Sequence, residues 1–191
     1  MRQIPKSATL LALVTSAMVV AGCSGNAGQD ASIDRDFIDM MVPHHESAIA
    51  MAEIAQDRAE HPELRQMADE IIGAQSAEIA QLKKWRQEWF GSSNTPSMAE
   101  MPMLPGMSPA GHSMSGGTMD MTAEVDGLRD ADPFDRLFID AMIQHHEQAV
   151  EAAEIVLART DRQEIRGLAQ NIVAAQTSEI EQLRKWRAAW Y

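Results

Sequence analysis

Two stretches of the sequence carry the same mixture of side chains that bind metals. The segment Asp39-Met-Met-Val-Pro-His-His-Glu46 returns 101 positions later as Asp140-Ala-Met-Ile-Gln-His-His-Glu147, and four of the six histidines lie in these two copies. Each copy places thioether, imidazole and carboxylate groups within two turns of a helix. A purely structural helix has little reason to collect this mixture, so the two copies indicate a metal site.

The spacing within each copy brings sulfur and nitrogen together. On a helix, residues three and four positions apart are neighbours, so Met41 reaches both His44 and His45, while Met40 and Met51 share the face of His44. Thioether with imidazole is a ligand set that suits copper, especially Cu(I). The chain has a single cysteine, which argues against a structural zinc site. The alternative is that these methionines are flexible core filler. The candidate ligands are Met40, Met41, His44, His45, Met51, Met142, His145 and His146.

Polar residues retained in both copies are candidates for orienting these imidazoles. Glu78 and Glu179 fall on apolar helix stripes, and a buried carboxylate without a partner costs several kcal/mol. We expect each to face a histidine, His45 and His146 respectively. Two neutral His to Glu hydrogen bonds that only fix the packing would explain the same pattern. The retained polar set is Asp39, Glu46, Gln75, Glu78, Asp140, Glu147, Gln176 and Glu179.

The stretch 91–131 has no helical period and is rich in Gly, Ser, Pro and Met. It is too long and too polar for a compact connection, so we expect a mobile linker. Seven of the fourteen methionines lie in it. Thioethers exposed on such a segment either reflect composition drift or capture a soft ion, and we favour capture. The candidates are Met98, Met101, Met103, Met107, His112, Met114, Met119 and Met121.

The elements that position these residues are duplicated helices. Residues 37–89 and 138–190 align without gaps and are identical at 26 of 53 positions. One hairpin of this size cannot cover its own apolar face, whereas two can close a core. We therefore predict an all-α four-helix bundle built from hairpins 33–90 and 132–191.

Several residues are expected to shape the individual helices. Pro43 should kink the first helix, and Pro62 should begin the second. Asp132 and Asp161 should cap the third and fourth helices.

The first 22 residues have the pattern of an export signal, with a basic start and an apolar run from Ala8 to Val20 that is short for a membrane span. The sequence Val20-Ala21-Gly22-Cys23 resembles a bacterial lipobox. That resemblance implies that Cys23 becomes the lipidated first residue, anchored to the cell membrane through a tether at 23–32. A buried thiol is the alternative for the only cysteine.

The charge of the chain limits its partners. Loss of Arg2 and Lys6 with the signal would leave 14 basic against 28 acidic residues. Such a surface attracts cations and disfavours nucleic acid.

Met-x-x-His-His-Glu followed by a Gln-x-x-Glu-Ile-x-x-Leu helix, present twice, resembles the ferritin-like family known as domain of unknown function 305. Members are typically exported bacterial proteins, and some are periplasmic copper-binding proteins for copper tolerance or delivery. The resemblance implies a ligand group of Met41, His44, His45, Met142, His145 and His146. The second copy has Ala141 and Ala152 in place of Met40 and Met51, so we expect the better site in the first hairpin.

We therefore expect a membrane-anchored, extracytoplasmic copper-binding protein, not an enzyme, that buffers copper or passes it to a transfer protein. One alternative is a ferritin-like di-metal oxidase or storage protein, but its usual Glu-x-x-His motif occurs nowhere in the chain. The other is a metal-free helical interaction module.

Overall fold

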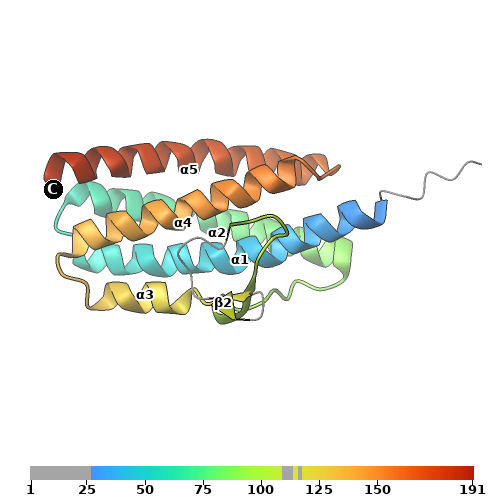
Figure 1. Cartoon of the computed structure of the whole chain (residues 1–191), viewed down its shortest axis with the longest axis horizontal. Coiled ribbons are helices and arrows are strands. Elements are labelled where there is room, and N and C mark those ends of the chain that lie inside the picture. The colour runs from blue at the N-terminus through green and yellow to red at the C-terminus, as the bar shows by residue number, and fades with distance from the viewer. Residues whose placement is uncertain (1–26, 109–113, 116–117) are drawn as a thin grey trace, which may run out of the picture.

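The computed structural model describes residues 27–108, 114–115 and 118–191. Four long helices dominate it: α1 (Ala27–Arg58), α2 (Pro62–Phe90), α4 (Phe134–Leu157) and α5 (Gln163–Trp190). Helices α1 and α2 form one hairpin, α4 and α5 form the other, and the two hairpins join through the packing of α1 on α4 (Figure 1). The predicted all-α bundle of two duplicated hairpins is confirmed.

The helix ends agree only partly with the sequence. Pro62 begins α2 as predicted, and the helix stops at Gly91, whose φ of 78° is a left-handed conformation that glycine adopts without strain. The predicted caps Asp132 and Asp161 are wrong, because α4 and α5 start one residue later in the chain, after Pro133 and Arg162, and without a side-chain cap.

Helix α1 is longer than the sequence indicated. It begins at Ala27, inside the predicted tether, and continues through Pro43 without interruption. Within the described residues, no helix is both long and apolar enough to cross a membrane. The predicted export signal and Cys23 lie outside those residues.

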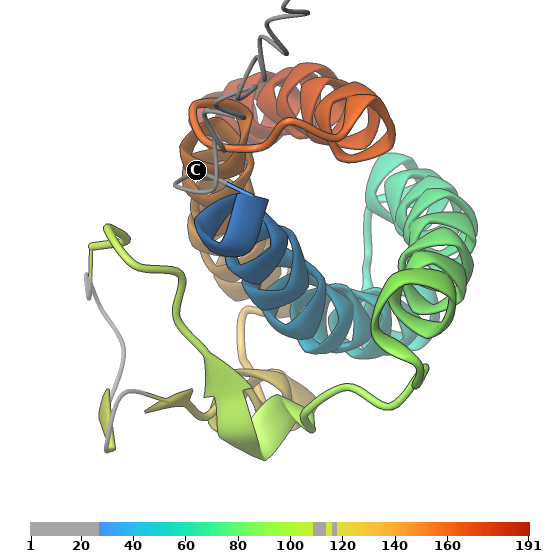
Figure 2. The same cartoon turned by 90° about the vertical axis from the view of Figure 1, so that its right-hand side faces the viewer.

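The segment between the hairpins contains regular structure. It comprises the 3-10 turn η1 (Met98–Glu100), the two-residue strands β1 (Met101–Pro102), β2 (Met114–Ser115) and β3 (Thr118–Met119), and helix α3 (Thr122–Arg129). The strands form an antiparallel sheet in the order β1-β3-β2. Figure 2 shows this segment on the outer side of α1, which contacts η1, β1 and α3. The prediction of a linker without regular structure is therefore wrong for its described parts.

Two apolar clusters fill the bundle, one on each side of a polar layer. The first cluster combines the start of α1, up to Val42, with the end of α4 from Ala149. The second combines the end of α1, from Ala48, with the start of α4, up to Met142. Between them both helices carry buried polar residues, so the histidine motifs meet at the middle of the core.

Each hairpin also makes polar contacts to the turn of the other hairpin. Asp34 of α1 accepts a hydrogen bond from Thr160 and pairs with Arg162, both in the turn between α4 and α5. Asp135 of α4 accepts hydrogen bonds from the backbone and ring of His61, in the turn between α1 and α2. The two aspartates are 101 positions apart, so the duplication built a reciprocal clasp that fixes how α1 crosses α4.

Candidate metal centre

The rings of His44 on α1 and His145 on α4 lie against each other, with their centroids 3.7 Å apart and their planes tilted by 39°. Both rings are buried. Imidazole binds a metal through the lone pair of a ring nitrogen. The histidines thus form one layer shared by both hairpins, and the expectation of a better site in the first hairpin stays a prediction.

Ser47 fixes the orientation of His145. Its hydroxyl donates to the carbonyl oxygen of His44 at 2.8 Å, and Nε2 of His145 lies 2.6 Å from the same hydroxyl oxygen. A hydroxyl has one proton to donate, so His145 donates from Nε2 and carries its lone pair on Nδ1. The position that corresponds to Ser47 in the second copy is Gln148, so the layer is not symmetric.

The other two imidazoles each face a glutamate of their own hairpin. Nε2 of His45 lies 2.7 Å from Oε2 of Glu78, and Nε2 of His146 lies 2.8 Å from Oε2 of Glu179. Both predicted pairs are confirmed. Nε2 of His45 is hydrogen-bonded to its glutamate, which places the ring proton there and leaves the lone pair on Nδ1. In the described part of the chain, Nδ1 of His45 and both ring nitrogens of His146 are buried and have no hydrogen-bond partner.

Two glutamines complete the polar layer. Gln75 and Gln176 are buried, and their Oε1 atoms have no hydrogen-bond partner among the described residues. The sequence predicted that they orient imidazoles, and that role stays a prediction. Together with the Nδ1 atoms of His45 and His146, their oxygens make a core rich in unused acceptors.

The methionines of the two motifs flank the layer. Met41 and Met142 precede the histidines by one turn and are fully buried, in the first and second apolar cluster respectively. Met40 and Met51 are fully buried in the same two clusters. Across the described ranges, no three His, Cys, Asp or Glu side chains gather as a metal ion would require.

The retained aspartates bind arginine rather than histidine. Asp39 accepts hydrogen bonds from Nε of Arg86 at 2.5 Å and from Nη2 at 3.1 Å, and Asp140 pairs with Arg187 in the same way. The expectation that Asp39 and Asp140 orient imidazoles is wrong, because a bidentate guanidinium already occupies both carboxylate oxygens. Both arginines are identical in the two copies, and that identity was the signal available for finding them.

The retained glutamates of the motifs have basic partners too. Glu46 pairs with Lys83 at 2.7 Å, and Glu147 pairs with Arg184 at 2.5 Å. These contacts join the two helices of each hairpin at the surface, so the orienting role predicted for both glutamates is wrong. Among the retained carboxylates, Glu78 contacts His45 and Glu179 contacts His146.

Four of the linker methionines predicted to be exposed are buried instead. They pack against the start of α1, because η1 and the short sheet bring them onto that helix. Met98 and Met103 are partly buried beside them. His112 and the side chain of Met114 lie outside the described residues. The four buried linker residues are Met101, Met107, Met119 and Met121.

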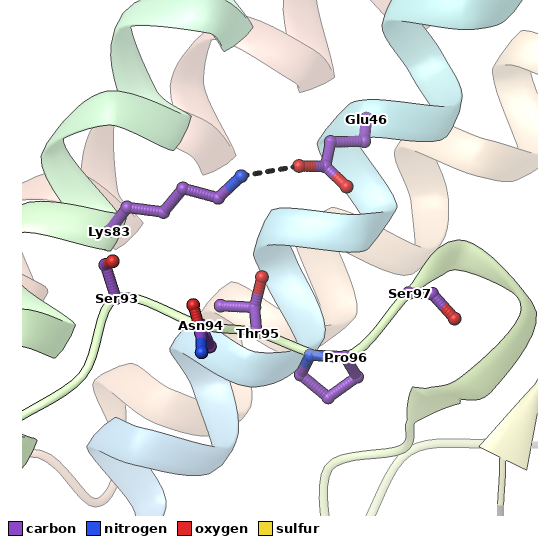
Figure 3. Close-up of a pocket in the computed structure, with 7 residues that line it drawn as sticks. All are labelled: Glu46, Lys83, Ser93, Asn94, Thr95, Pro96 and Ser97. Atoms are coloured by element: carbon purple, nitrogen blue, oxygen red, sulfur yellow. Dashed lines mark hydrogen bonds and ion pairs between the residues drawn. The ribbon is translucent and has the colours of Figure 1, made fainter.

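A surface pocket of about 430 Å³ lies beside the bundle but has different chemistry. Figure 3 shows Glu46 and Lys83 pointing toward each other at one side of it, and the segment 93–97 lines the other. Hydroxyl, amide and ion-paired groups form its walls. The residues that line this pocket include neither histidine nor methionine. The buried histidine layer is therefore a better candidate for a metal centre than this pocket.

The family described as "Domain of unknown function (DUF305)" matches residues 34–187, which include both hairpins and the segment between them. The chain belongs to this family. No curated protein matches it. The DUF305 match confirms the resemblance that the repeated motif indicated.

Solved structures similar to this DUF305 chain include copper-bound ones. CopM in the Cu(I)-bound form is 39% identical, with a TM-score of 0.65, and the match covers 83% of this chain and 97% of that one. CopM in the Cu(II)-bound form is 40% identical, with a TM-score of 0.66 and the same coverage. A DUF305 protein from Streptomyces coelicolor, described as secreted, is 26% identical over 83% of this chain and 94% of that one, with a TM-score of 0.66.

Proposed function

We propose that this protein binds copper outside the cytoplasm, in the imidazole layer between its hairpins, and buffers the ion or passes it to a transfer protein. Cu(I) is the favoured state, and copper is cargo rather than a catalyst. The observation that carries the proposal is the pair of buried Nδ1 atoms on His45 and His146, each with a glutamate at the opposite ring nitrogen.

A packing role alone leaves these nitrogens unexplained. Burying a hydrogen-bonding group without a partner costs about 1–3 kcal/mol, and the layer contains such nitrogens on His45 and His146 and such oxygens on Gln75 and Gln176. A carboxylate behind the imidazole is the usual support of a metal-binding histidine, because it fixes the tautomer and raises the basicity of the ligand. A bound metal would use the lone pairs that the bundle otherwise buries.

The chemistry of the donors selects a soft ion. Imidazole suits copper, and thioether suits Cu(I) in particular, whereas hard cations prefer carboxylate and carbonyl oxygen. Met41 and Met142 supply the sulfur. Support also comes from the likeness to CopM, which has been solved with Cu(I) and Cu(II), and from a formal net charge of −12 that attracts cations to the surface.

The proposed location rests on the beginning of the chain. The apolar run and the lipobox-like sequence that ends at Cys23 support export and attachment to the cell membrane. In this position the protein would meet copper before the ion enters the cell or after its export.

A competition titration tests the function. The full chain is titrated anaerobically with Cu(I) against a chromophoric chelator, beside the variant His44→Ala with His45→Ala. We expect the double variant to lose tight binding. Gln56→Ala is the control, because Gln56 is an exposed residue of α1 outside the layer.

A second variant tests the site with substitutions that should leave the fold intact. Met41→Leu with Met142→Leu keeps the side-chain volume but removes both thioethers, and we expect Cu(I) affinity to fall at least about tenfold, or 1.4 kcal/mol. If both variants fold and bind Cu(I) as the original chain does, the layer is only a packing device and the proposal is wrong.

A further inference from the structure

A second group of sulfur atoms lies away from the imidazole layer, where the short sheet covers α1. Met101 of β1 and Met119 of β3 are directly opposite each other in the antiparallel pair, and both side chains are buried. Opposite residues project from the same face of a sheet, with Cβ atoms about 5 Å apart. Backbone pairing, rather than a flexible loop, therefore holds two thioethers side by side.

Neighbouring elements add further methionines to this group. Met40 of α1 is fully buried in the same core cluster, and α1 contacts both β1 and η1. Met121 follows β3, is fully buried, and donates its backbone N–H to the carbonyl oxygen of Met98 at 3.0 Å. Sulfur atoms from a helix, a sheet and a turn thus belong to one contiguous cluster.

Ordinary core filling explains this composition poorly. Of the five buried apolar side chains described between residues 91 and 121, four are methionine and one is Leu104. Ordering a methionine costs more side-chain entropy than ordering leucine or isoleucine, so a segment that only had to cover a helix would favour branched residues. The repeat also indicates that these methionines do more than fill the core. The sheet methionines pack in the first cluster only, and the second copy has Ala141 in place of Met40.

We propose that Met40, Met101, Met119 and Met121 form a second site, made of thioethers alone, that binds a soft monovalent cation, Cu(I) or Ag(I). The ligands are neutral and all sulfur, which suits a soft ion and disfavours Zn²⁺ and Cu(II). A single charge is also less costly to bury than a double one. The site extends the proposed copper binding but does not depend on the imidazole layer.

Metal counting in conservative variants tests this site. The full chain is titrated with Ag(I) and, anaerobically, with Cu(I), beside Met101→Leu with Met119→Leu. We expect this variant to bind one ion fewer than the original chain. Met67→Leu is the matched control, because Met67 is a buried methionine of the second cluster and its loss should leave the count unchanged. An unchanged count in the folded double variant would overturn the proposal.

Two further measurements keep the two sites distinguishable. The variant His44→Ala with His45→Ala should retain the thioether-bound ion, and X-ray absorption of that ion should show sulfur neighbours only; nitrogen neighbours would overturn the assignment. If Met101→Leu with Met119→Leu does not fold, Met40→Leu with Met121→Leu tests the same group from its other side. If the imidazole site alone is wrong, the variants at the histidines and at Met41 and Met142 will bind as the original chain does. If the thioether site alone is wrong, the variant at Met101 and Met119 will bind as the original chain does.

Discussion

The ring centroids of His44 and His145 lie 3.7 Å apart although the two residues belong to different hairpins and are 101 positions apart in the chain. Their contact makes the site a property of the assembled bundle, since neither hairpin alone contains both rings. Separation of α1 from α4 would take the layer apart. Binding of an ion in this layer should therefore stabilise the packing of the two hairpins on each other.

The shared layer predicts that His44 and His145 act together in copper binding. His44→Ala and His145→Ala should each weaken Cu(I) binding, and the double variant should lose clearly less than the sum of the two single losses, because residues in contact are not independent. A double-mutant cycle on the dissociation constants measures the coupling. Strictly additive losses would mean that each hairpin binds its own ion.

The two Asp to Arg pairs should differ in their contribution to stability. Asp39 and Arg86 expose only 14% and 7% of their side chains, whereas Asp140 and Arg187 expose 33% and 43%. Asp39→Asn leaves a buried guanidinium without its counter-charge, which should cost about 3 kcal/mol. Asp140→Asn should cost much less, because solvent screens that pair. Urea unfolding of both variants measures the difference, and equal losses would contradict this account.

The clasp between the hairpins predicts a large effect at Asp135. This buried carboxylate accepts the backbone N–H groups of Glu60 and His61, each at 2.9 Å, and Nδ1–H of the His61 ring at 2.6 Å. Asp135→Asn should lower the free energy of unfolding by roughly 3 kcal/mol, because charged hydrogen bonds are lost in a buried place. Asp132→Asn is the control, since Asp132 is exposed, and a thermal melt of the two variants should separate them. Equal melting temperatures would show that the clasp is dispensable.

Asp36 should make the stability depend on pH. Burial raises the pKa of its carboxyl above the usual 3.8, and the nearby negative charge of Asp39 raises it further. The folded protein therefore holds this proton more tightly than the unfolded chain does, so the contribution of Asp36 to stability falls as the pH rises above about 3.8.

Asp36→Asn removes this effect. The variant should unfold at a slightly higher urea concentration than the original chain at about pH 7, and the gain should vanish below the unfolded-state value of about pH 3.8. Asp57→Asn, at an exposed position of the same helix, is the control. A gain of the same size at both pH values would show that charge at Asp36 is not its cause.

Much of the fold could be predicted from the sequence because both copies of the repeat carry the same apolar pattern. The periodic apolar residues of each copy required a hairpin, and the gapless offset required two equivalent ones. The pairs of His45 with Glu78 and of His146 with Glu179 could be predicted because a carboxylate on a buried stripe needs a nearby donor. The bundle has both contacts, at 2.7 and 2.8 Å.

Other features depend on contacts that no local pattern specifies. The contact between the His44 and His145 rings depends on how α1 crosses α4. The burial of Met101 and Met119 depends on a sheet whose two-residue strands are too short to show an alternating pattern in the sequence. Asp34 and Asp135 are identical in the repeat but lie just before the aligned window. Extension of that alignment by three residues would have indicated the clasp.

The most direct test of the account is to locate the metal. Crystals of the protein grown with Cu(I) under anaerobic conditions should give an anomalous difference peak at the copper edge between α1 and α4, within bonding distance of Nδ1 of His45 or His146 and of a thioether from Met41 or Met142. Anomalous density only at the protein surface, with the imidazole layer unchanged and empty of copper, would contradict the central claim.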